Sequence, residues 1–270
     1  MSDRIQEHFG LSRRPFDKEV PPETLWMAGG RQQSLDRLVG AVEHREHALV
    51  TGEAGAGKTC VLRALRERLS PAHFRVVYAA HVTLGRRDFY RQLCYAMGVE
   101  PKATAAAMFE ALQREITTSN SDHRQHAVIV LDEAHLMPDT TLSHLHVLAN
   151  FQWDSRSLLS LVLVGLPELH ARLRLGVHRS LLTRIGTWVT LEASSPELTV
   201  GYVRQRMASA GARQEVFTAD GLSLLHELSG GVLRSVDVLA GSALRLAALE
   251  DKRLVDRDVV RRGAAGTPLY

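Results

Sequence analysis

The chain has 270 residues, of which 45% are hydrophobic and 23% charged, and its 33 basic and 30 acidic residues leave a formal net charge of +3. This balance is typical of a soluble globular protein with a substantial core, and it argues against a disordered, collagenous or coiled-coil chain. The longest apolar stretch, Leu158 to Leu166, has only nine residues, whereas a membrane-spanning helix needs roughly 20. The N-terminus lacks the apolar segment of a secretory signal, and two cysteines are too few for a disulfide framework. We therefore expect a cytoplasmic protein without a membrane span.

Residues 1–30 are predicted to form an irregular arm. Prolines and glycines at this density mark turns rather than regular structure. The arm contains three prolines and a glycine pair: Pro15, Pro21, Pro22 and Gly29–Gly30.

Beyond the arm, helical and strand-like patterns alternate along the chain. Apolar residues at helical spacing predict helices at residues 31–46, 58–69, 87–97, 103–116 and 139–151. Short apolar runs predict strands at residues 48–51, 74–79, 127–131, 158–164 and 188–191. The run at 127–131 is apolar throughout, which is typical of a parallel sheet covered on both faces. Strands that alternate with helices in this way predict an α/β fold.

The last part of the chain has a different pattern. Ser195 followed by Pro196 is typical of a helix cap followed by proline at the first helical position. Helices are predicted at residues 196–210, 218–228, 233–249 and 256–262. The sequence therefore predicts three parts: an arm at 1–30, an α/β nucleotide-binding domain at 31–192 and a small helical domain at 193–270.

The segment Gly52–Thr59, Gly-Glu-Ala-Gly-Ala-Gly-Lys-Thr, matches the phosphate-binding P-loop pattern G-x-x-x-x-G-K-[ST]. Phosphate oxygens need several backbone N–H donors at close range, which glycines at the start of a helix provide. Lys58 is expected to reach the β- and γ-phosphates, and the Thr59 hydroxyl to ligate Mg²⁺. Cys60, which follows the motif, favours a packing role over a redox role. The predicted nucleotide contacts are Gly52, Glu53, Ala54, Gly55, Ala56, Gly57, Lys58, Thr59 and Cys60.

The apolar strand at 127–131 ends in the acidic pair Asp132–Glu133. A carboxylate at the end of a central strand holds Mg²⁺ through water in P-loop enzymes, which is the role expected of Asp132. Glu133 is then placed to polarise the attacking water. Together with the P-loop, this pair predicts hydrolysis of a nucleoside triphosphate.

The histidines give weaker signals. His135 completes an Asp-Glu-Ala-His run that also names a helicase family, but without further helicase motifs a supporting or loop role is expected. His144 and His146 are two residues apart on a predicted helix and so cannot form an i, i+4 metal pair. His123 and His126 are expected in a polar loop. No metal is predicted beyond the Mg²⁺ that accompanies the nucleotide.

Three arginines are candidates for stabilising the charge that builds on the γ-phosphate. Arg179 and Arg184 follow the predicted strand at 158–164 and could project towards a neighbouring subunit. Arg234 follows a glycine pair in the helical domain and could reach bound phosphates from a lid. Surface roles for these arginines are equally compatible with the sequence.

With these motifs in place, the chain resembles AAA+ ATPases, and in particular the group that contains ExeA-type secretion-assembly ATPases and TniB/TnsC-like transposition regulators. The resemblance extends over nearly the whole chain. Its segments, in chain order, are Phe9–Phe16, Thr51–Thr59, Val130–His135, Leu148–Phe151, Leu163–Leu169, Thr183–Ile185 and Ser229–Arg234.

The resemblance implies roles for individual residues. Arg184 would be the finger that acts on a neighbouring protomer, and Arg234 the sensor 2 arginine of a helical lid. It also implies ATP-dependent assembly into rings or filaments with nucleotide between protomers. Two positions depart from the pattern: Leu166 stands near sensor 1, where the group usually has Gln, and Leu233 stands where Pro usually precedes the sensor 2 arginine. Because an apolar side chain cannot hydrogen-bond a γ-phosphate or water, slow hydrolysis and a long-lived ATP-bound assembly are expected.

Within this group, the sequence favours a transposition regulator. ExeA-type proteins continue into a membrane span, whereas this chain ends at Tyr270 without a long apolar run. We therefore expect an ATP-dependent regulator that coats DNA through its backbone and recruits a transposase or other recombinase. The alternatives are an ATPase that assists assembly of a secretion or cell-envelope machine, and a switch NTPase that neither polymerises nor binds DNA. The candidate DNA contacts are Thr83, Arg86, Arg87 and Lys102.

Overall fold

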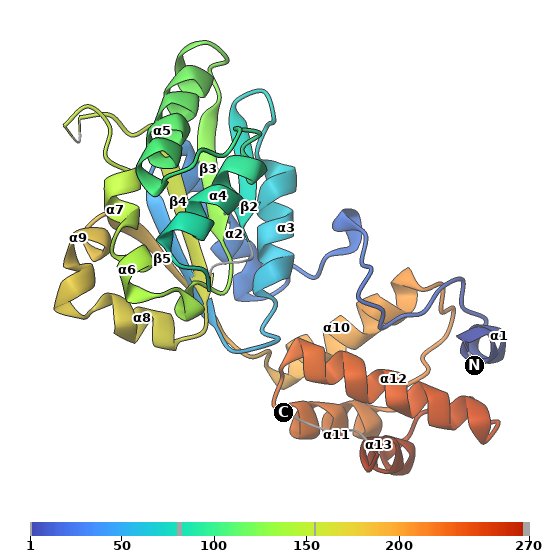
Figure 1. The fold of residues 1–270 in the computed structure, drawn as a ribbon. Coiled ribbons are helices and arrows are strands. Elements are labelled where there is room, and N and C mark those ends of the chain that lie inside the picture. The colour runs from blue at the N-terminus through green and yellow to red at the C-terminus, as the bar shows by residue number, and fades with distance from the viewer. Residues whose placement is uncertain (1, 80–82, 154, 267–270) are drawn as a thin grey trace. The chain divides into compact units, whose positions relative to one another are not determined.

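The computed structural model describes residues 2–79, 83–153 and 155–266, and the chain divides into two compact units (Figure 1). The sheet unit comprises Gln33–Glu53 and Val61–Leu191. The helical unit comprises Met1–Gln32, Ala54–Cys60 and Glu192–Tyr270, so it contains most of the P-loop. Among the described residues, no helix combines the length and the apolar character that crossing a membrane requires.

The sheet has five parallel strands in the order β2-β3-β4-β1-β5, which confirms the predicted α/β fold. The strands are β1 (His47–Gly52), β2 (Phe74–Ala79), β3 (His126–Leu131), β4 (Leu159–Gly165) and β5 (Ile185–Leu191). β5 begins three residues earlier than its apolar pattern predicted. Its first residues pair with the start of β1. Gly186 and Thr187 are small or polar, so an apolar pattern could not reveal this pairing. Every residue of β1, β3 and β4 is buried, as expected for central strands covered on both faces.

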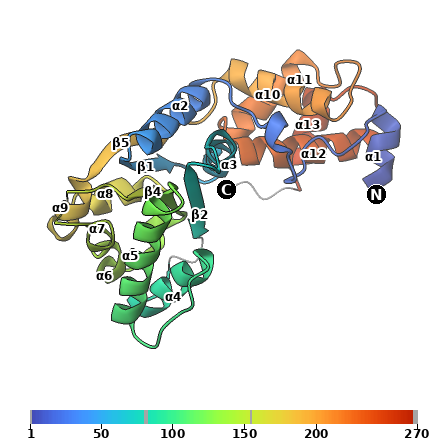
Figure 2. The ribbon, with the colours of Figure 1, turned by 90° about the horizontal axis from the view of Figure 1, so that it is seen from above.

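Helices cover both faces of this sheet (Figure 2). α2 (Gly30–Glu43) and α3 (Lys58–Arg68) lie on one face, and α4 (Arg86–Ala96) and α5 (Ala105–Ser121) lie on the other. The second face holds a large apolar core in which side chains such as Leu93, Leu112 and Ile129 are 0–1% exposed. Thr104 caps α5 by accepting a hydrogen bond from the backbone N–H of Ala107, which shows why this helix begins at Ala105, two residues after its predicted start.

The long helix predicted at 139–151 is not continuous. The structure has α6 (Asp139–Leu142) and α7 (Leu145–Leu148) instead, separated by a turn at Ser143 and His144. Leu142, Leu145 and Leu148 are all 0–1% exposed, so both short helices face the core. At the break, the backbone N–H of His144 donates to the carbonyl of Thr141, three residues back, and Nδ1 of His144 lies 2.5 Å from the hydroxyl of Tyr90 on α4. This contact with α4 fixes the turn. The short helix η2 (Ala134–Leu136) lies between β3 and α6. Three more short helices lie between β4 and β5: α8 (Glu168–Leu173), η3 (Gly176–His178) and α9 (Arg179–Leu182).

The helical unit packs α1 (Ser2–Phe9), α10 (Pro196–Ser209), α11 (Ala219–Ser229), α12 (Leu233–Leu249) and α13 (Arg257–Ala264) around a second apolar core. Three of these helices have side-chain caps. Ser195, Thr218 and Asp256 each accept a hydrogen bond from the backbone N–H three residues on. These caps explain why the sequence located α10, α11 and α13 to within two residues.

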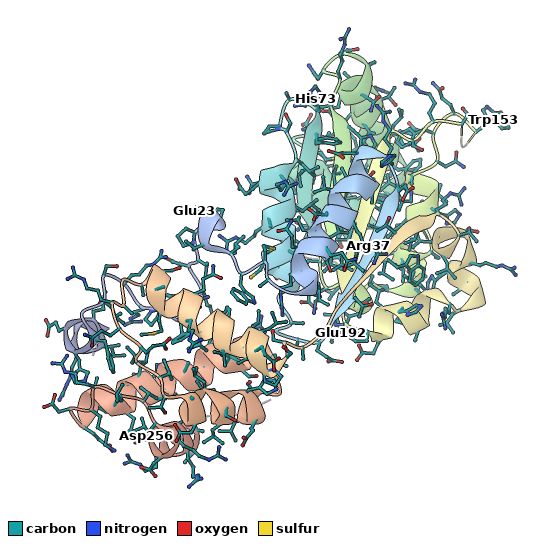
Figure 3. All side chains as sticks on the ribbon, turned by 180° about the vertical axis from the view of Figure 1, so that it is seen from behind. Glu23, Arg37, His73, Trp153, Glu192 and Asp256 are labelled. Atoms are coloured by element: carbon teal, nitrogen blue, oxygen red, sulfur yellow. The ribbon has the colours of Figure 1, made fainter. Side chains whose placement is uncertain are left out.

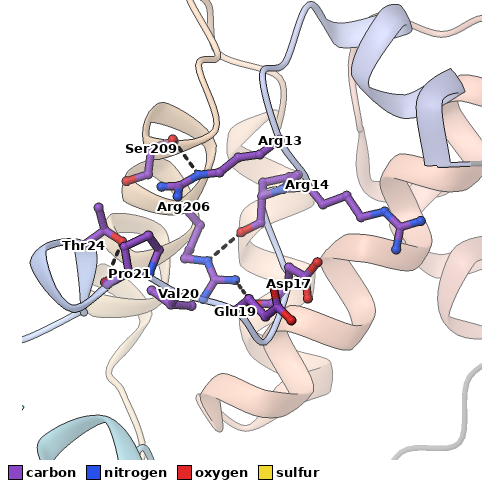
Figure 4. Close-up of a pocket in the computed structure, with 10 residues that line it drawn as sticks. Arg13, Arg14, Asp17, Glu19, Val20, Pro21, Thr24, Arg206 and Ser209 are labelled. Carbon is purple, nitrogen blue, oxygen red and sulfur yellow. Dashed lines mark hydrogen bonds between the residues drawn. The ribbon is translucent and has the colours of Figure 1, made fainter. Parts of the chain in front are cut away.

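The prediction of an irregular arm is wrong for its first residues, which form α1, and the prolines further on leave only the short η1 (Pro22–Thr24). The arm is fixed to α10 through Arg206, whose side chain is buried (Figure 4). Its Nε donates to the carbonyl of Pro15 and its Nη2 to that of Asp17, both at 2.6 Å. One buried guanidinium thus satisfies carbonyls that have no partner within a regular element.

The prediction that His126 lies in a polar loop is wrong. His126 is the first residue of β3 and is only 3% exposed. Its Nε2 lies 2.9 Å from the Ser160 hydroxyl. Burial, with the nearby charge of Arg45 and His47, lowers the pKa of His126 from its ordinary 6.5 to about 4. The ring is therefore neutral in the folded chain at physiological pH.

This neutral histidine predicts a loss of stability in mild acid. The unfolded chain takes up the His126 proton near pH 6.5 and the folded chain only near pH 4, so stability decreases as the pH falls between these values. We expect His126 to account for about 2 kcal/mol of the loss in unfolding free energy between pH 7 and pH 5. Urea unfolding of the parent and of His126→Gln at both pH values measures it. Equal pH dependence in the two proteins would contradict the assignment.

Candidate functional site

The P-loop joins the end of β1 at Gly52 to the start of α3 at Lys58. Gly55 and Gly57 have backbone φ angles of +83° and +99°, which glycine adopts without steric cost. Turns of this kind form concave nests of N–H groups that bind anions. Lys58 is 8% exposed, and the side chain of Thr59 is exposed. The loop thus has the backbone that phosphate binding requires.

The start of α12 encloses one side of this loop within the helical unit. A Cβ on Gly55 would lie 2.7 Å from the Cβ of Arg234 and 2.9 Å from a methyl group of Val232. The Arg234 backbone N–H donates to the carbonyl of Gly55 at 3.4 Å. The structure therefore brings the predicted sensor 2 arginine next to the P-loop, with its side chain exposed.

Sequence reasoning missed Arg31, the second residue of α2, which packs directly on the P-loop. Its Nη2 donates to the carbonyl of Ala56 at 3.1 Å and to the hydroxyl of Ser194 at 3.3 Å. The side chain is 4% exposed, its Nε has no hydrogen-bond partner, and burial lowers the pKa of the guanidinium. A Cβ on Gly57 would meet this Nε at 3.3 Å. No local motif marks this arginine, because its contacts come from residues 25 and 163 positions away.

The acidic pair follows β3 in the sheet unit. Asp132 is 6% exposed, and both of its carboxylate oxygens accept hydrogen bonds. Oδ1 accepts from the backbone N–H of Glu133 at 2.9 Å, and Oδ2 accepts from the hydroxyl of Tyr78 on β2 at 2.7 Å. Burial and this bond to Asp132 raise the pKa of Tyr78, so the phenol remains protonated and donates. Tyr78 thereby fixes the orientation of the buried carboxylate.

Glu133 has a strained backbone. Its φ is +54°, which is uncommon for a residue other than glycine and costs of order 1 kcal/mol. The side chain is exposed, and its Oε2 lies 3.5 Å from Nδ1 of His135. The buried Asp132 carboxylate is thus followed by a residue with a strained backbone, Glu133, whose carboxylate reaches into solvent.

Leu166, the residue predicted near sensor 1, lies between the ends of β1 and β3. β4 pairs with both of these strands, Thr51 being opposite Gly165 and Leu131 opposite Leu163. Adjacent strands are about 5 Å apart. Leu166, which directly follows β4, therefore lies at the edge of the sheet where β1 and β3 end. Its backbone N–H donates to Nδ1 of His135 at 3.3 Å. His135 therefore links the segment after β3 to the segment after β4.

Arg184 lies at the opposite edge of the sheet. It immediately precedes β5, whose first residue pairs with His47 at the start of β1. The six residues of β1 separate this edge from Gly52 by about 17 Å. Arg184 is half-buried, and its Nη1 donates to the carbonyl of Ser180 at 2.9 Å, whereas Arg179 is exposed at the start of α9. Neither arginine is at the sheet edge where β1 leads into the P-loop.

The candidate DNA contacts lie elsewhere in the sheet unit. Thr83, Arg86 and Arg87 are exposed, and the two arginines are the first residues of α4. Lys102 is also exposed, with its Nζ 3.5 Å from a carboxylate oxygen of Glu100. All four side chains are therefore accessible to solvent, but no contact joins them into one cluster in the described residues.

Comparison with known proteins gives two matches in sequence. A family model described as "AAA domain" matches residues 41–173. General secretion pathway protein A of Aeromonas hydrophila is 33% identical over 258 residues, which cover 94% of this chain. The chain spans 47% of the length of that protein, so the comparison concerns about half of the relative.

Solved structures with a similar fold include three proteins with TM-scores above 0.6. Cdc6p from Pyrobaculum aerophilum has a TM-score of 0.72 at 16% identity and covers 93% of this chain and 70% of its own. The ORC2 protein of Aeropyrum pernix, solved as ADPNP–ADP complexes, has a TM-score of 0.71 at 18% identity, with 94% and 72% covered. RuvB of Thermotoga maritima, a Holliday junction branch migration motor, has a TM-score of 0.62 at 14% identity, with 93% and 73% covered. At these identities the likeness concerns the fold. The family match, the curated relative and the solved structures all point the same way: residues 41–173 match the AAA domain model, and the chain has the α/β fold of these structures around a P-loop motif.

Proposed function

We propose that this chain is an ExeA-like ATPase that works in the cytoplasm and assists the assembly of a secretion or other cell-envelope machine. The observation that carries the proposal is the 33% identity to general secretion pathway protein A over 94% of the chain. It favours the alternative that the sequence analysis ranked second over the transposition regulator that it ranked first. In this proposal, bound ATP drives assembly of copies of the chain, and hydrolysis ends it.

We propose that Mg²⁺-ATP is held by the P-loop and the acidic pair. Gly52 to Cys60 surround the phosphates, and Lys58 neutralises charge on the β- and γ-phosphates. The Thr59 hydroxyl and the buried Asp132 carboxylate, the latter through water, hold Mg²⁺, a hard cation that prefers oxygen ligands. Glu133 orients and polarises the attacking water. The left-handed turns at Gly55 and Gly57 and the oriented Asp132 carboxylate support these assignments.

Three arginines complete the proposed site. Arg234, whose backbone already contacts Gly55, reaches the phosphates from residues 193–270 acting as a lid. Arg184 acts on nucleotide bound by a neighbouring protomer, because it lies at the sheet edge opposite the one from which the P-loop emerges. Arg31 adds a buried N–H next to Gly57 and is a further proposed contact of the nucleotide.

The response to DNA separates this proposal from the transposition hypothesis. An ExeA-like ATPase is expected to hydrolyse ATP at the same rate, within about twofold, with and without DNA. It should also bind an inner-membrane partner only when ATP is present. A DNA-coating regulator would instead show DNA-stimulated hydrolysis, filaments on DNA in electron microscopy, and binding that falls steeply with salt because it depends on phosphate contacts. That second result, together with its loss in an Arg86→Ala, Arg87→Ala variant, would favour the transposition hypothesis.

Tyr78→Phe is expected to increase the Mg²⁺ requirement of hydrolysis. The variant loses the hydroxyl that donates to Asp132, and a hydrogen bond to a charged group contributes about 1.5 kcal/mol, or roughly tenfold. The Mg²⁺ concentration for half-maximal turnover should rise about tenfold, while ATP binding without Mg²⁺ is unchanged. Tyr95→Phe, which alters an exposed tyrosine of α4, is the matched control. An identical Mg²⁺ titration in Tyr78→Phe and the parent would remove Tyr78 from the site.

Leu166→Gln is expected to accelerate hydrolysis several-fold. Leucine at this position cannot hydrogen-bond the γ-phosphate or the attacking water, whereas glutamine can. Steady-state turnover at saturating Mg²⁺-ATP measures the effect. Leu175→Gln, at an exposed leucine of the same unit, controls for a general effect of the substitution. No rise over the parent rate would count against slow hydrolysis caused by Leu166.

A further inference from the structure

His135 lies beside the proposed catalytic acid, Glu133, just beyond the end of β3. Its Nδ1 is 3.5 Å from Oε2 of Glu133, and it accepts a hydrogen bond from the backbone N–H of Leu166 at 3.3 Å. The His135 side chain is 11% exposed and that of Glu133 is 52% exposed. A ring nitrogen that accepts a hydrogen bond carries no proton and cannot donate one. While Nδ1 is held against the Leu166 N–H, it therefore gives no proton to Glu133, whose carboxylate can then act on water.

The space around the His135 ring is closely filled. Gly165, the last residue of β4, faces this ring: a Cβ on Gly165 would lie 3.1 Å from Nδ1 and 3.2 Å from the backbone N of His135. Non-bonded carbon atoms pack best at about 3.5–4.0 Å, so a side chain at position 165 would shift the ring. Glycine thus allows the end of β4 to approach His135 closely.

Arg172 on α8 fixes the backbone that carries His135. Its Nη1 donates to the carbonyl of His135, and its Nη2 donates to the carbonyl of Met137 at 2.8 Å. Both carbonyls lie at the end of the short helix η2, where a helix leaves carbonyls without partners of its own. Leu169 and Leu173 anchor α8 in the core, and both are 0% exposed. The guanidinium thus ties the turn after β3 to a firmly packed helix.

A carboxylate and a buried histidine hold Arg172 in turn. Oδ1 of Asp139 accepts from Nη2 of Arg172 and from Nε2 of His178, the latter at 3.1 Å. The hydrogen bond from Arg172, followed by that from His178, lowers the pKa of Asp139, so the carboxylate is ionised and accepts both. The His178 side chain is 0% exposed, and within the part of the chain that the structure describes its Nδ1 is buried without a hydrogen-bond partner. The ring of His178 therefore serves Asp139 through Nε2.

We infer that Arg172 is a positioning residue for ATP hydrolysis, which acts through His135 on Glu133. It keeps the His135 ring against the Leu166 N–H, so that the Glu133 carboxylate stays unprotonated and directed at water. Asp139 holds Arg172 in the required orientation. The inference rests on the proposed role of Glu133 and adds the residues that maintain it. The ion pair of Arg172 and Asp139, at 26% and 56% exposed, would contribute little to stability by itself.

The separate effects on kcat and KM test this role. Arg172→Ala should lower kcat about tenfold, the effect of losing a hydrogen bond from a charged group, and leave the KM for ATP within about twofold of the parent. Arg172→Lys keeps the charge but lacks the fork that reaches two carbonyls and a carboxylate, so it should lose about threefold in kcat. Asp139→Asn, at an exposed carboxylate, should also lose about threefold. Steady-state turnover over a range of Mg²⁺-ATP concentrations gives both constants.

A second background shows whether Arg172 acts through His135. His135→Leu removes the ring nitrogens and should lower kcat about tenfold. Adding Arg172→Ala to His135→Leu should change kcat by less than about twofold, because the connection to Glu133 is already broken. His135→Asn should retain about a third of the parent kcat or more, because its amide oxygen can accept from the Leu166 N–H in place of Nδ1.

Arg174→Ala and Arg37→Ala are the matched controls. Arg174 is an exposed arginine that directly follows α8. Arg37 is an exposed arginine on α2 (Figure 3). Both variants should keep the parent kcat and KM, so that a decrease in Arg172→Ala is not a general effect of removing an arginine.

A parent kcat in Arg172→Ala would overturn the inference. So would an equal loss from Arg172→Ala in the parent and in His135→Leu, because Arg172 would then act on the sheet unit as a whole. If Arg172→Ala does not fold, Asp139→Asn decides instead: it must lower kcat in the parent and leave it unchanged in His135→Leu. Normal hydrolysis by Glu133→Gln would contradict the proposed role of the acid itself, which is a different result from any of these.

Discussion

Lys58→Ala is expected to weaken ATP binding by at least 100-fold. The ammonium of Lys58 begins α3 at the end of the P-loop and is 8% exposed, so its charge acts on the phosphates with little screening by water. Removing one partner of a buried, charge-assisted interaction costs about 3 kcal/mol, which corresponds to roughly 100-fold in affinity. Isothermal titration calorimetry with ATP and Mg²⁺ measures the loss directly.

Lys18→Ala is the matched control, because Lys18 is an exposed lysine of the arm. It should bind ATP like the parent. If Lys58→Ala bound ATP within threefold of the parent, the P-loop would not hold the nucleotide as proposed. The assigned roles of Thr59, Asp132 and Glu133 would then be wrong as well.

Glu133→Gln is expected to bind ATP normally and to hydrolyse it 10²- to 10⁴-fold more slowly, the range typical of losing a general base. Glutamine has nearly the same shape but cannot accept a proton from water. Because assembly requires bound ATP in the proposed function, the variant should remain assembled where the parent dissociates. Turnover measurements and analytical ultracentrifugation with ATP give the two readouts.

The control for this variant is Glu110→Gln, at an exposed glutamate of α5. It should leave both turnover and assembly unchanged. Normal hydrolysis by Glu133→Gln would assign the base to another residue. Failure to bind ATP would show that Glu133 acts on nucleotide affinity rather than on the water.

The choice between a secretion-assembly ATPase and a transposition regulator illustrates what the sequence alone could not decide. The absence of a long apolar run favours a transposition regulator. The 33% identity to a secretion-pathway protein extends over 258 residues and is the more specific observation. Exposed arginines at the start of α4 suit DNA phosphates but equally suit a solvated helix end, so they do not discriminate.

The sequence by itself determined the elements whose signals are local. Buried strands such as β3 are continuous apolar runs, and helices such as α10 begin at a capping serine, so neighbouring residues are enough to locate them. The P-loop and the acidic pair were also found in this way, because each occupies a few consecutive positions.

Only the tertiary structure decided the contacts between distant positions. Arg31 reaches Ala56 and Ser194, and Tyr78 orients Asp132 from the neighbouring strand. At the break in the helix predicted at 139–151, His144 contacts Tyr90, which is 54 positions away. The physical reason is common to these cases: backbone propensity and motif spacing act over a few residues, whereas burial and hydrogen bonding act between whichever residues the fold brings together.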